Sequence, residues 1–208
     1  MPAPPRPRST SGRPRGADST QRRAAILDAA EALFSEQGYR GVSMSAVARA
    51  AGISGTGLVH HFATKDDLLQ AVMDRRDERD SAQFQLNAGK TGWAFVAALK
   101  DLARHNEGQE SMVRLYASVA GEAVTPGHPA SRWLREHYAH TRTLLASAVR
   151  EAVAAGELRA DAPAETIARL LLAAMDGLQL QWLADDAYPS MAEDFAELVD
   201  SLHARWAA

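Results

Sequence analysis

The sequence predicts an all-α protein of about nine helices, in which a three-helix N-terminal domain with a helix-turn-helix precedes a larger helical domain. Two observations predict this fold. Apolar residues recur at intervals of three and four along most of the chain, and no segment shows the strict alternation of a half-buried strand. The 208 residues are 46% apolar, which is enough for a packed core, and the absence of cysteine excludes disulfides and thiolate zinc sites.

Residues 1–17 are rich in Pro, Arg, Ser and Gly and are expected to form a flexible basic arm. Their prolines oppose the amphipathic helix of a transit peptide, and no apolar run follows them to make a signal peptide. Purely apolar runs such as 170–175 are far shorter than a membrane span. We therefore expect a protein of the reducing cytoplasm without a membrane partner.

The first helix is expected over about 19–37, with Asp18 as its N-cap and Gln21 completing the capping box. Its apolar residues fall on one stripe, and Gly38 is expected to end it. That stripe consists of Ile26, Leu27, Ala30, Leu33 and Phe34.

Two short helices follow, and their spacing predicts a helix-turn-helix. Ser43 is expected to cap the N-terminus of the first of these two short helices. Gly52 is expected to end that helix by adopting the left-handed backbone conformation. The second is expected over about 54–62, with Leu58 and Phe62 buried. Thr64 and Asp67 form a capping box for a fourth helix, whose charged run 74–80 is interpreted as a solvated face with an Arg76–Asp80 pair.

The remaining pattern stays helical, with helices expected near 92–106, 109–124, 129–155, 163–185 and 190–206. Glycine and proline mark plausible boundaries between them. The helix 163–185 is apolar around most of its circumference, which predicts burial on all sides.

Charge is divided unevenly along the chain. Residues 1–65 hold nine Lys and Arg against four Asp and Glu, whereas the rest holds fourteen against twenty-two. A basic front on an acidic body indicates that the front binds a polyanion, although chance could produce the same asymmetry.

Three runs in this basic region resemble the N-terminal module of TetR-type transcriptional regulators: ILDAAEALF at 26–34, VARAAGIS at 47–54 and LVHHFATKDDL at 58–68. The resemblance covers about 22–72 and implies a DNA-binding domain at 18–64 and a ligand-binding and dimerisation domain at 65–208. The third helix would then lie in the major groove of double-stranded DNA. The family usually has a tyrosine that contacts the DNA backbone where Val59 stands here, and valine cannot make that hydrogen bond. The candidate DNA-binding residues are Arg22, Arg23, Ser43, Ser54, Gly55, Thr56, His60, His61 and Lys65.

Aromatic, Met and amide side chains of the predicted body suggest an apolar ligand pocket, although they equally describe an ordinary helical core. The candidate pocket residues are Trp93, Met112, Tyr116, Trp133, His137, Tyr138, Met175, Gln179 and Trp182. The last two helices are expected to form a four-helix bundle with a second protomer. The candidate interface residues are Leu170, Leu171, Leu178, Phe195, Val199, Leu202 and Trp206.

An enzyme is the distant alternative. His137 and His140 have metal-ligand spacing beside Glu136, but no third ligand motif accompanies them. No nucleophile elbow or phosphate loop is present, and the glycines at 52, 55 and 57 follow no strand. We therefore expect no catalytic residue, metal or cofactor.

The function predicted from these features is a DNA-binding repressor that binds a palindromic operator as a homodimer and is released by a small, mostly apolar effector. The alternative is a DNA-binding regulator controlled by a protein partner or by no ligand.

Overall fold

The computed structural model describes residues 15–83 and 89–208 and is all-α over both ranges, which confirms the expected fold class. Within them, β-type pairing is limited to an isolated bridge between Leu158 and Ala207. The helices are α1 (Arg15–Gly41), α2 (Met44–Ala50), α3 (Gly55–His61), α4 (Lys65–Gln83), α5 (Gly92–Ala97), α6 (Leu99–Glu107), α7 (Glu110–Ala123), α8 (Ser131–Ala154), α9 (Ala164–Ala184) and α10 (Met191–Trp206).

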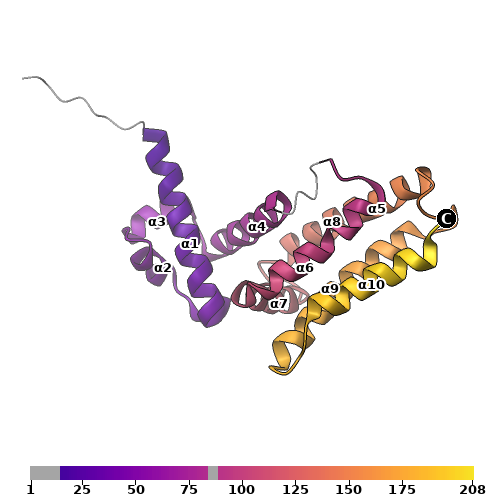
Figure 1. Cartoon of the computed structure of the whole chain (residues 1–208). Helices are drawn as coiled ribbons and strands as arrows, with labels where there is room; N and C mark the ends of the chain where they lie inside the picture. The colour runs from indigo at the N-terminus through magenta and orange to yellow at the C-terminus, as the bar shows by residue number, and fades with distance from the viewer. Residues whose placement is uncertain (1–14, 84–88) are drawn as a thin grey trace, which may run out of the picture.

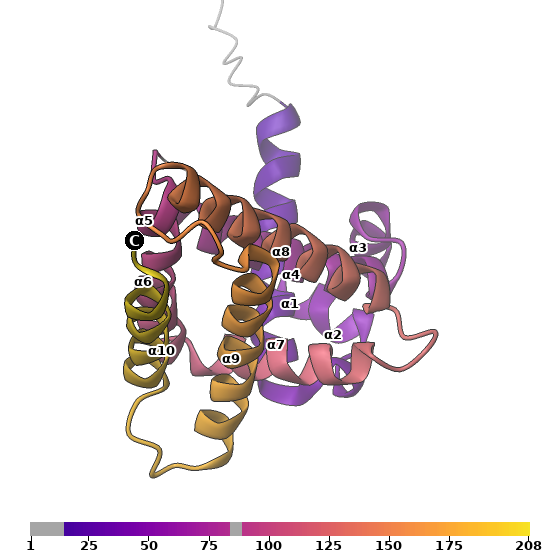
Figure 2. The same cartoon turned by 90° about the vertical axis from the view of Figure 1, so that its right-hand side faces the viewer.

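The molecule is elongated, with α1–α3 at one end and α5–α10 at the other (Figure 1). α8 packs against α5 and α9, and α10 packs against α6 and α9. Figure 2 shows α9 and α10 running side by side. α4 packs on α1, and α7 contacts both α1 and α9. These two helices therefore join the small N-terminal unit to the body.

Both ends of α1 and the helix expected over 92–106 differ from expectation. α1 runs to Gly41, with a break at Gly38, the residue expected to end it, where φ is 70°. α1 begins at Arg15, so residues 15–17 of the expected arm are helical and Asp18 lies inside the helix instead of at its N-cap. Residues 1–14 lie outside the described residues. The helix expected over 92–106 is divided at Ala98, where Asp101 N donates to Ala98 O in a tight i to i+3 bond. No Gly or Pro marks this break, and the apolar pattern continues across it, so the sequence predicted a single helix here.

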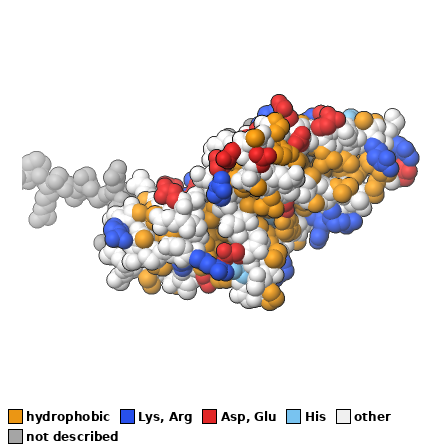
Figure 3. All heavy atoms as spheres, turned by 90° about the horizontal axis from the view of Figure 1, so that it is seen from below, with side chains coloured by type: hydrophobic (Ala, Val, Ile, Leu, Met, Phe, Trp, Pro, Cys, Tyr) orange, Lys and Arg blue, Asp and Glu red, His pale blue; other side chains and the backbone are white. Residues whose placement is uncertain are grey.

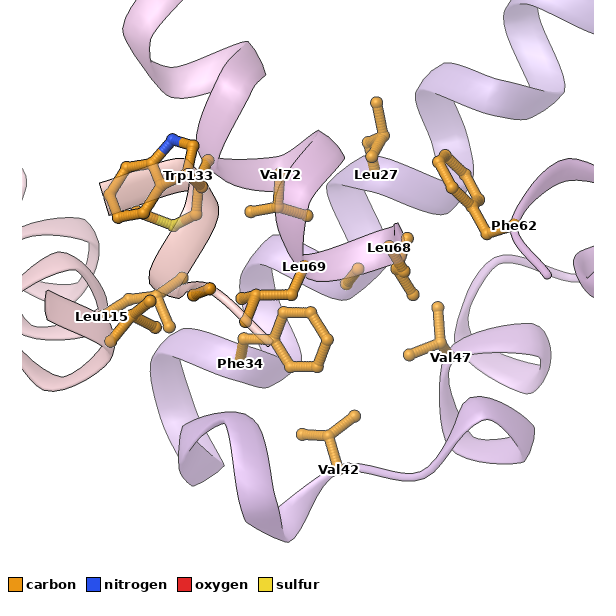
Figure 4. Close-up of a cluster of buried hydrophobic side chains, with 14 of the residues drawn as sticks. Leu27, Phe34, Val42, Val47, Phe62, Leu68, Leu69, Val72, Leu115 and Trp133 are labelled. Carbon is orange, nitrogen blue, oxygen red and sulfur yellow. The ribbon is translucent and has the colours of Figure 1, made fainter. Parts of the chain in front are cut away.

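A first hydrophobic cluster joins α1–α3 to α4, α7 and α8. Phe34 of α1, Leu58 of α3 and Leu69 of α4 are almost fully buried. Figure 4 shows side chains of these helices converging, with Leu115 and Trp133 at the far side of the cluster. Each such burial contributes about 1.5–3 kcal/mol, so the position of α3 is fixed by the same core that holds α4.

A second cluster fills the body between α5, α6, α8, α9 and α10. Phe195 and Val199 of α10 are buried in it together with Leu171 of α9. Among the described residues, no helix combines the length and the apolar character that crossing a membrane requires.

Candidate nucleic-acid interface and internal cavity

The α2–α3 unit is built from local caps, as the sequence predicts. Ser43 Oγ accepts a hydrogen bond from Ala46 N at 3.1 Å, and Ser54 Oγ accepts one from Gly57 N at 3.1 Å. Gly52 has φ 67°, a conformation that costs other residues about 1–2 kcal/mol. Ser43 therefore starts α2, Gly52 turns the chain after that helix, and Ser54 starts α3.

The start of α3 presents small and polar residues to solvent. Ser54, Gly55, Thr56 and His60 are all exposed, whereas His61 is half-buried and its ring lies 5.8 Å from that of His60. A Cβ added at Gly55 would meet no atom within 4 Å. Packing within the chain therefore does not demand glycine at this position, and the free space faces outward.

Val59 is the apolar exception on α3, because 53% of it is exposed. It stands where the resemblance places a tyrosine, and its side chain offers no hydrogen bond. The polar contacts of this helix therefore come from its first turn and from His60.

The basic residues around α3 differ in how far their side chains already contact other groups of the protein. Arg22 and Arg23 are exposed on α1, and the Arg23 guanidinium lies 5.0 Å from the centre of the Phe62 ring. Lys65 Nζ donates to Val42 O at 2.8 Å and lies 4.3 Å from the centre of the Tyr39 ring. Lys65 therefore ties the start of α4 to the loop after α1, a contact that the sequence did not predict.

A charge network joins α4 to α1. Arg75 donates from Nη1 to Asp28 Oδ1 at 2.7 Å and from Nη2 to Glu31 Oε2 at 2.5 Å. One turn later, Arg79 Nη1 lies 2.9 Å from Glu31 Oε2. Glu31 is thus shared by two guanidinium groups, and α4 carries the link between the N-terminal unit and the body.

A cavity of about 290 Å³, partly open to solvent, lies in the body against helices α4 to α10. Five of the nine predicted pocket residues line it: Tyr116, Trp133, His137, Met175 and Gln179. The rings of Trp133 and His137 stack with centroids 5.3 Å apart, and Tyr116 meets both edge-on. The predicted aromatic wall therefore lies on one side of a hollow space.

The other four predicted pocket residues lie elsewhere. Trp93 stacks on His203 in the second cluster, and Met112 packs against the first cluster. Trp182 is only half-buried and does not line the cavity. Tyr138 is likewise outside the lining but donates from its hydroxyl to Asp176, which does line it. Trp93, Met112 and Trp182 therefore do not line this cavity, because helical periodicity does not tell which apolar face meets a cavity and which meets a core.

The charged run of α4 is part of the cavity wall, which corrects its interpretation as a solvated face. Arg76 is only 8% exposed and lies 3.5 Å from Asp77 and 3.5 Å from Asp80. The expected Arg76–Asp80 pair is therefore present but lies in the interior. The Arg76 guanidinium covers the Tyr116 ring at 4.5 Å, and Asp77 Oδ2 lies 2.9 Å from His137 Nδ1.

Burial and like charges disturb the carboxyl groups near this wall. Burial raises the pKa of Asp80 above its ordinary value, although Arg76 opposes the rise. Burial also raises the pKa of Asp74, with repulsion from Asp77 adding to it. The cavity wall on α4 therefore disfavours additional negative charge.

Asp176 on α9 accepts two tyrosine hydroxyls, from Tyr116 at 3.1 Å and from Tyr138 at 2.5 Å. Burial and the adjacent carboxylate raise the pKa of Tyr138 to about 12, and burial raises the pKa of Tyr116 as well. Both phenols therefore remain protonated donors. No described Lys or Arg pairs with Asp176.

Two buried polar atoms at the cavity have no hydrogen-bond partner: Gln179 Oε1 and Trp133 Nε1. Gln179 is 1% exposed and Trp133 is 3% exposed. Leaving such groups unpaired costs about 1–3 kcal/mol each. A molecule in the cavity that supplies a donor to Gln179 and an acceptor to Trp133 would remove this cost.

The predicted dimer residues divide into two groups. Leu171, Phe195, Val199 and Leu202 are at most 8% exposed and pack inside the protomer, so they leave little surface for a second protomer. α10 turns its apolar face to its own core. Leu178 and Trp206 are half-buried, also against the second cluster.

Leu170 and Leu180, by contrast, are 49% and 56% exposed on the outer face of α9. Leu180 was not among the predicted interface residues. Figure 3 shows hydrophobic side chains gathered at the end of the molecule that holds α9 and α10. The apolar circumference of α9 thus covers the protomer core on one side and leaves leucines uncovered on the other.

No group of three or more metal-ligating side chains occurs among the described residues. His137 is engaged with Asp77, while His140 is exposed. The i, i+3 histidine pair therefore lacks a third ligand in the described part of the chain.

Comparison with protein families gives two matches along the chain. A model described as "Bacterial regulatory proteins, tetR family" matches residues 26–72, and one described as "BetI-type transcriptional repressor, C-terminal" matches residues 94–206. The HTH-type transcriptional regulator UidR of Escherichia coli (strain K12) is 29% identical over 166 residues, which are 79% of this chain and 83% of UidR.

Solved structures share the fold over most of their length. Salmonella enterica GusR superposes with a TM-score of 0.72 at 26% identity, covering 88% of this chain and 96% of GusR. SmeT, solved in complex with triclosan, superposes with a TM-score of 0.78 at 19% identity, covering 90% of this chain and 92% of SmeT.

Proposed function

Because the chain belongs to the TetR family of DNA-binding transcriptional regulators, we propose that it is a repressor which binds a palindromic operator as a homodimer and leaves it when a small molecule occupies the cavity. The exposed polar start of α3 carries this proposal. Ser54, Gly55 and Thr56 stand at the N-terminus of a capped helix, where free backbone N–H groups favour anions.

In the proposed complex, α3 lies in the major groove. Thr56 and His60 reach base edges, and the backbone at Gly55 approaches the duplex closely because no side chain intervenes. Ser43, Arg22 and Arg23 contact phosphates from the flanking helices. Lys65 uses part of its three-donor ammonium on Val42 O and has an N–H left for a phosphate.

The homodimer is proposed to form through the outer face of α9. Leu170 and Leu180 are large apolar residues left half exposed on a helix whose other side is buried in the core. Covering such a face against its symmetry mate removes apolar area from water and creates a two-fold pair of α3 helices. A two-fold protein reads a palindromic duplex.

Release of the operator is proposed to act through α4. Arg76 on one face of this helix lines the cavity, whereas Arg75 on the next face holds Asp28 and Glu31 of α1. A ligand that changes the surroundings of Arg76 therefore acts on the helix that positions the N-terminal unit. The triclosan complex of SmeT, which shares this fold, supports an organic molecule as the signal.

The proposal is tested by selecting a duplex from a random library and measuring its affinity by fluorescence anisotropy at several salt concentrations. We expect affinity to fall steeply with salt, as phosphate neutralisation requires. Thr56→Ala is expected to relax the preference for particular bases by about 1–3 kcal/mol. Thr143→Ala, an exposed threonine of α8, is the matched control. If Thr56→Ala selects the same sequence as strongly as the control does, α3 is not the reading helix.

A further inference from the structure

Resting on the proposed effector role of the cavity, we infer that the effector is a small organic ammonium ion which donates N–H bonds to Asp176 and Gln179 and packs an apolar body against α8 and α9. This chemistry adds a positive charge to the small, mostly apolar effector that the sequence suggested. It follows from the unpaired acceptor Gln179 Oε1 and from the sign of the charge around it, while the donor Trp133 Nε1 is not served by the ammonium group.

The two acceptors stand together on α9. Asp176 and Gln179 are three residues apart, which places side chains on neighbouring turns of one helix face, about 5–6 Å apart at Cβ. Both line the cavity. Asp176 accepts one tyrosine hydroxyl on each oxygen and keeps lone pairs for further donors, while Gln179 Oε1 has no partner although the residue is 1% exposed. One ammonium group carries three donors and can serve both.

The charge of the wall favours a cation. Five carboxylates line the cavity, from Asp74, Asp77, Asp80, Glu136 and Asp176, against one guanidinium. That guanidinium, on Arg76, already has Asp77 and Asp80 as partners. His137 lies against Asp77, and His140 is exposed. Asp176 is therefore left without a cation among the described residues, and an anion entering the cavity would meet net repulsion.

The rest of the lining suits an apolar body. Leu144 of α8, Leu172 of α9 and Leu102 of α6 face the same space, together with the thioether of Met175. Leu172 precedes Asp176 by one turn on the same helix face, so the apolar part of the ligand can lie along α9 from the ammonium site. A volume of about 290 Å³ is near the lower end for ligand sites, about 300 Å³, which points to a small molecule.

The test uses three probes with one body and different heads: 4-phenylbutylamine, 4-phenylbutan-1-ol and 4-phenylbutyrate. Their binding to the full chain is measured by isothermal titration calorimetry at neutral pH. We expect the amine to bind about tenfold more tightly than the alcohol, because a charge-assisted hydrogen bond replaces a neutral one, and the carboxylate to bind weakest.

Variants locate the effect. Asp176→Asn removes the charge with little change of shape and is expected to weaken the amine about tenfold while leaving the alcohol within about twofold. Asp186→Asn, an exposed aspartate in the connection between α9 and α10, makes the same charge change away from the cavity and should leave both unchanged. Circular dichroism melting of each variant establishes that it is folded before titration.

The inference is overturned if the alcohol or the carboxylate binds as tightly as the amine, if Asp176→Asn leaves the amine affinity unchanged, or if the wild-type chain binds no amine at millimolar concentration. Its failure is distinguishable from failure of the proposed function. Amine binding without release of a selected operator would refute the signalling role and leave the cation site standing. Operator binding that is released by a ligand, combined with preference for the alcohol, would refute the cation site and leave the proposed function standing.

Discussion

Replacing Glu31 with Gln tests whether α4 holds α1 through their shared charge network. Glu31 Oε2 accepts from Arg75 at 2.5 Å and from Arg79 at 2.9 Å. The Arg75 side chain is only 14% exposed, so it depends on these carboxylates for the solvation it loses in the fold. In the variant, the amide keeps the shape of the side chain and its oxygen can still accept from Arg75, but Asp28, which is largely exposed, is the one described carboxylate that Arg75 keeps.

The expected loss follows from the burial of each bond. A hydrogen bond between charged groups contributes about 1.5–3 kcal/mol, and the neutral amide oxygen recovers about 0.5–1.5 kcal/mol of it. Arg79 is half exposed, so its bond to Glu31 adds little. We therefore expect the free energy of unfolding to fall by about 1.5 kcal/mol, which for a chain of this size lowers Tm by about 3–6 °C.

The measurement is thermal unfolding followed by circular dichroism, with Glu36→Gln as the matched control. Glu36 is exposed on the same helix, so its replacement makes the same chemical change outside the network. The two variants should differ clearly in Tm. If Glu31→Gln melts within about 1 °C of the control, the network does not hold α1, and coupling through α4 loses its physical basis.

Three further substitutions address the interface, the turn and the cavity wall. Leu180→Glu should give folded monomers in light scattering, because an unpaired charge in the proposed α9 interface costs about 3–5 kcal/mol. The control Val124→Glu, at a 75% exposed valine, should stay dimeric. If both variants are dimeric, the interface lies elsewhere. Gly52→Ala should lower the free energy of unfolding by about 1–2 kcal/mol, because φ of Gly52 is 67°. Gly55→Ala should keep the Tm of the wild-type protein and weaken operator binding. Equal Tm values for the two variants would contradict the argument that the turn needs glycine at position 52. Burial raises the pKa of Asp80 above 3.8, so ionisation of Asp80 lowers the stability of the folded protein as pH rises through the raised pKa. Asp80→Asn should therefore raise the urea midpoint of unfolding at pH 7, and the difference from wild type should shrink toward pH 3.8. A difference that stays constant over this pH range would refute the assignment.

The helix-turn-helix could be predicted because its signals are local. Ser43 and Ser54 cap the helices that follow them, and Gly52 adopts the positive φ that ends α2. Each of these contacts spans at most three residues. The exposure of Thr56 and His60 follows from the same periodicity, because Leu58 and Phe62 occupy the buried face.

The charged wall of the cavity could not be predicted in the same way. Arg76 lies in a run of seven residues with only charged side chains, and such a run on a helix is usually solvated. Its burial depends on helices α6, α7 and α8, which are distant in sequence and close over this part of α4. The pairing of Arg76 with Asp80 was predictable from spacing, but its desolvation depends on tertiary packing.

The burial of several predicted interface residues within the protomer has a related reason. α9 is apolar around most of its circumference, and this predicted burial on all sides. The structure buries Leu171 in the protomer and leaves Leu170 half exposed, although the two are adjacent in sequence. Composition showed that α9 has two apolar faces. Which face meets the protomer core depends on where α8 and α10 pack, which the sequence pattern does not encode.

The geometry of α4 explains how a cavity inside the body can act on a helix at the far end of the molecule. Arg75 and Arg79 form one row along α4 and hold α1, while Arg76 and Asp80 form the adjacent row, offset by one residue or about 100° around the helix. A rigid helix cannot shift one row without shifting the other. Only residues 62–64 separate α3 from α4, so this connection can absorb little of a displacement of α4 before the displacement reaches α3. A ligand exploits this connection only if it binds the displaced arrangement more tightly than the DNA-bound one, since equal affinity for both would leave the operator occupied.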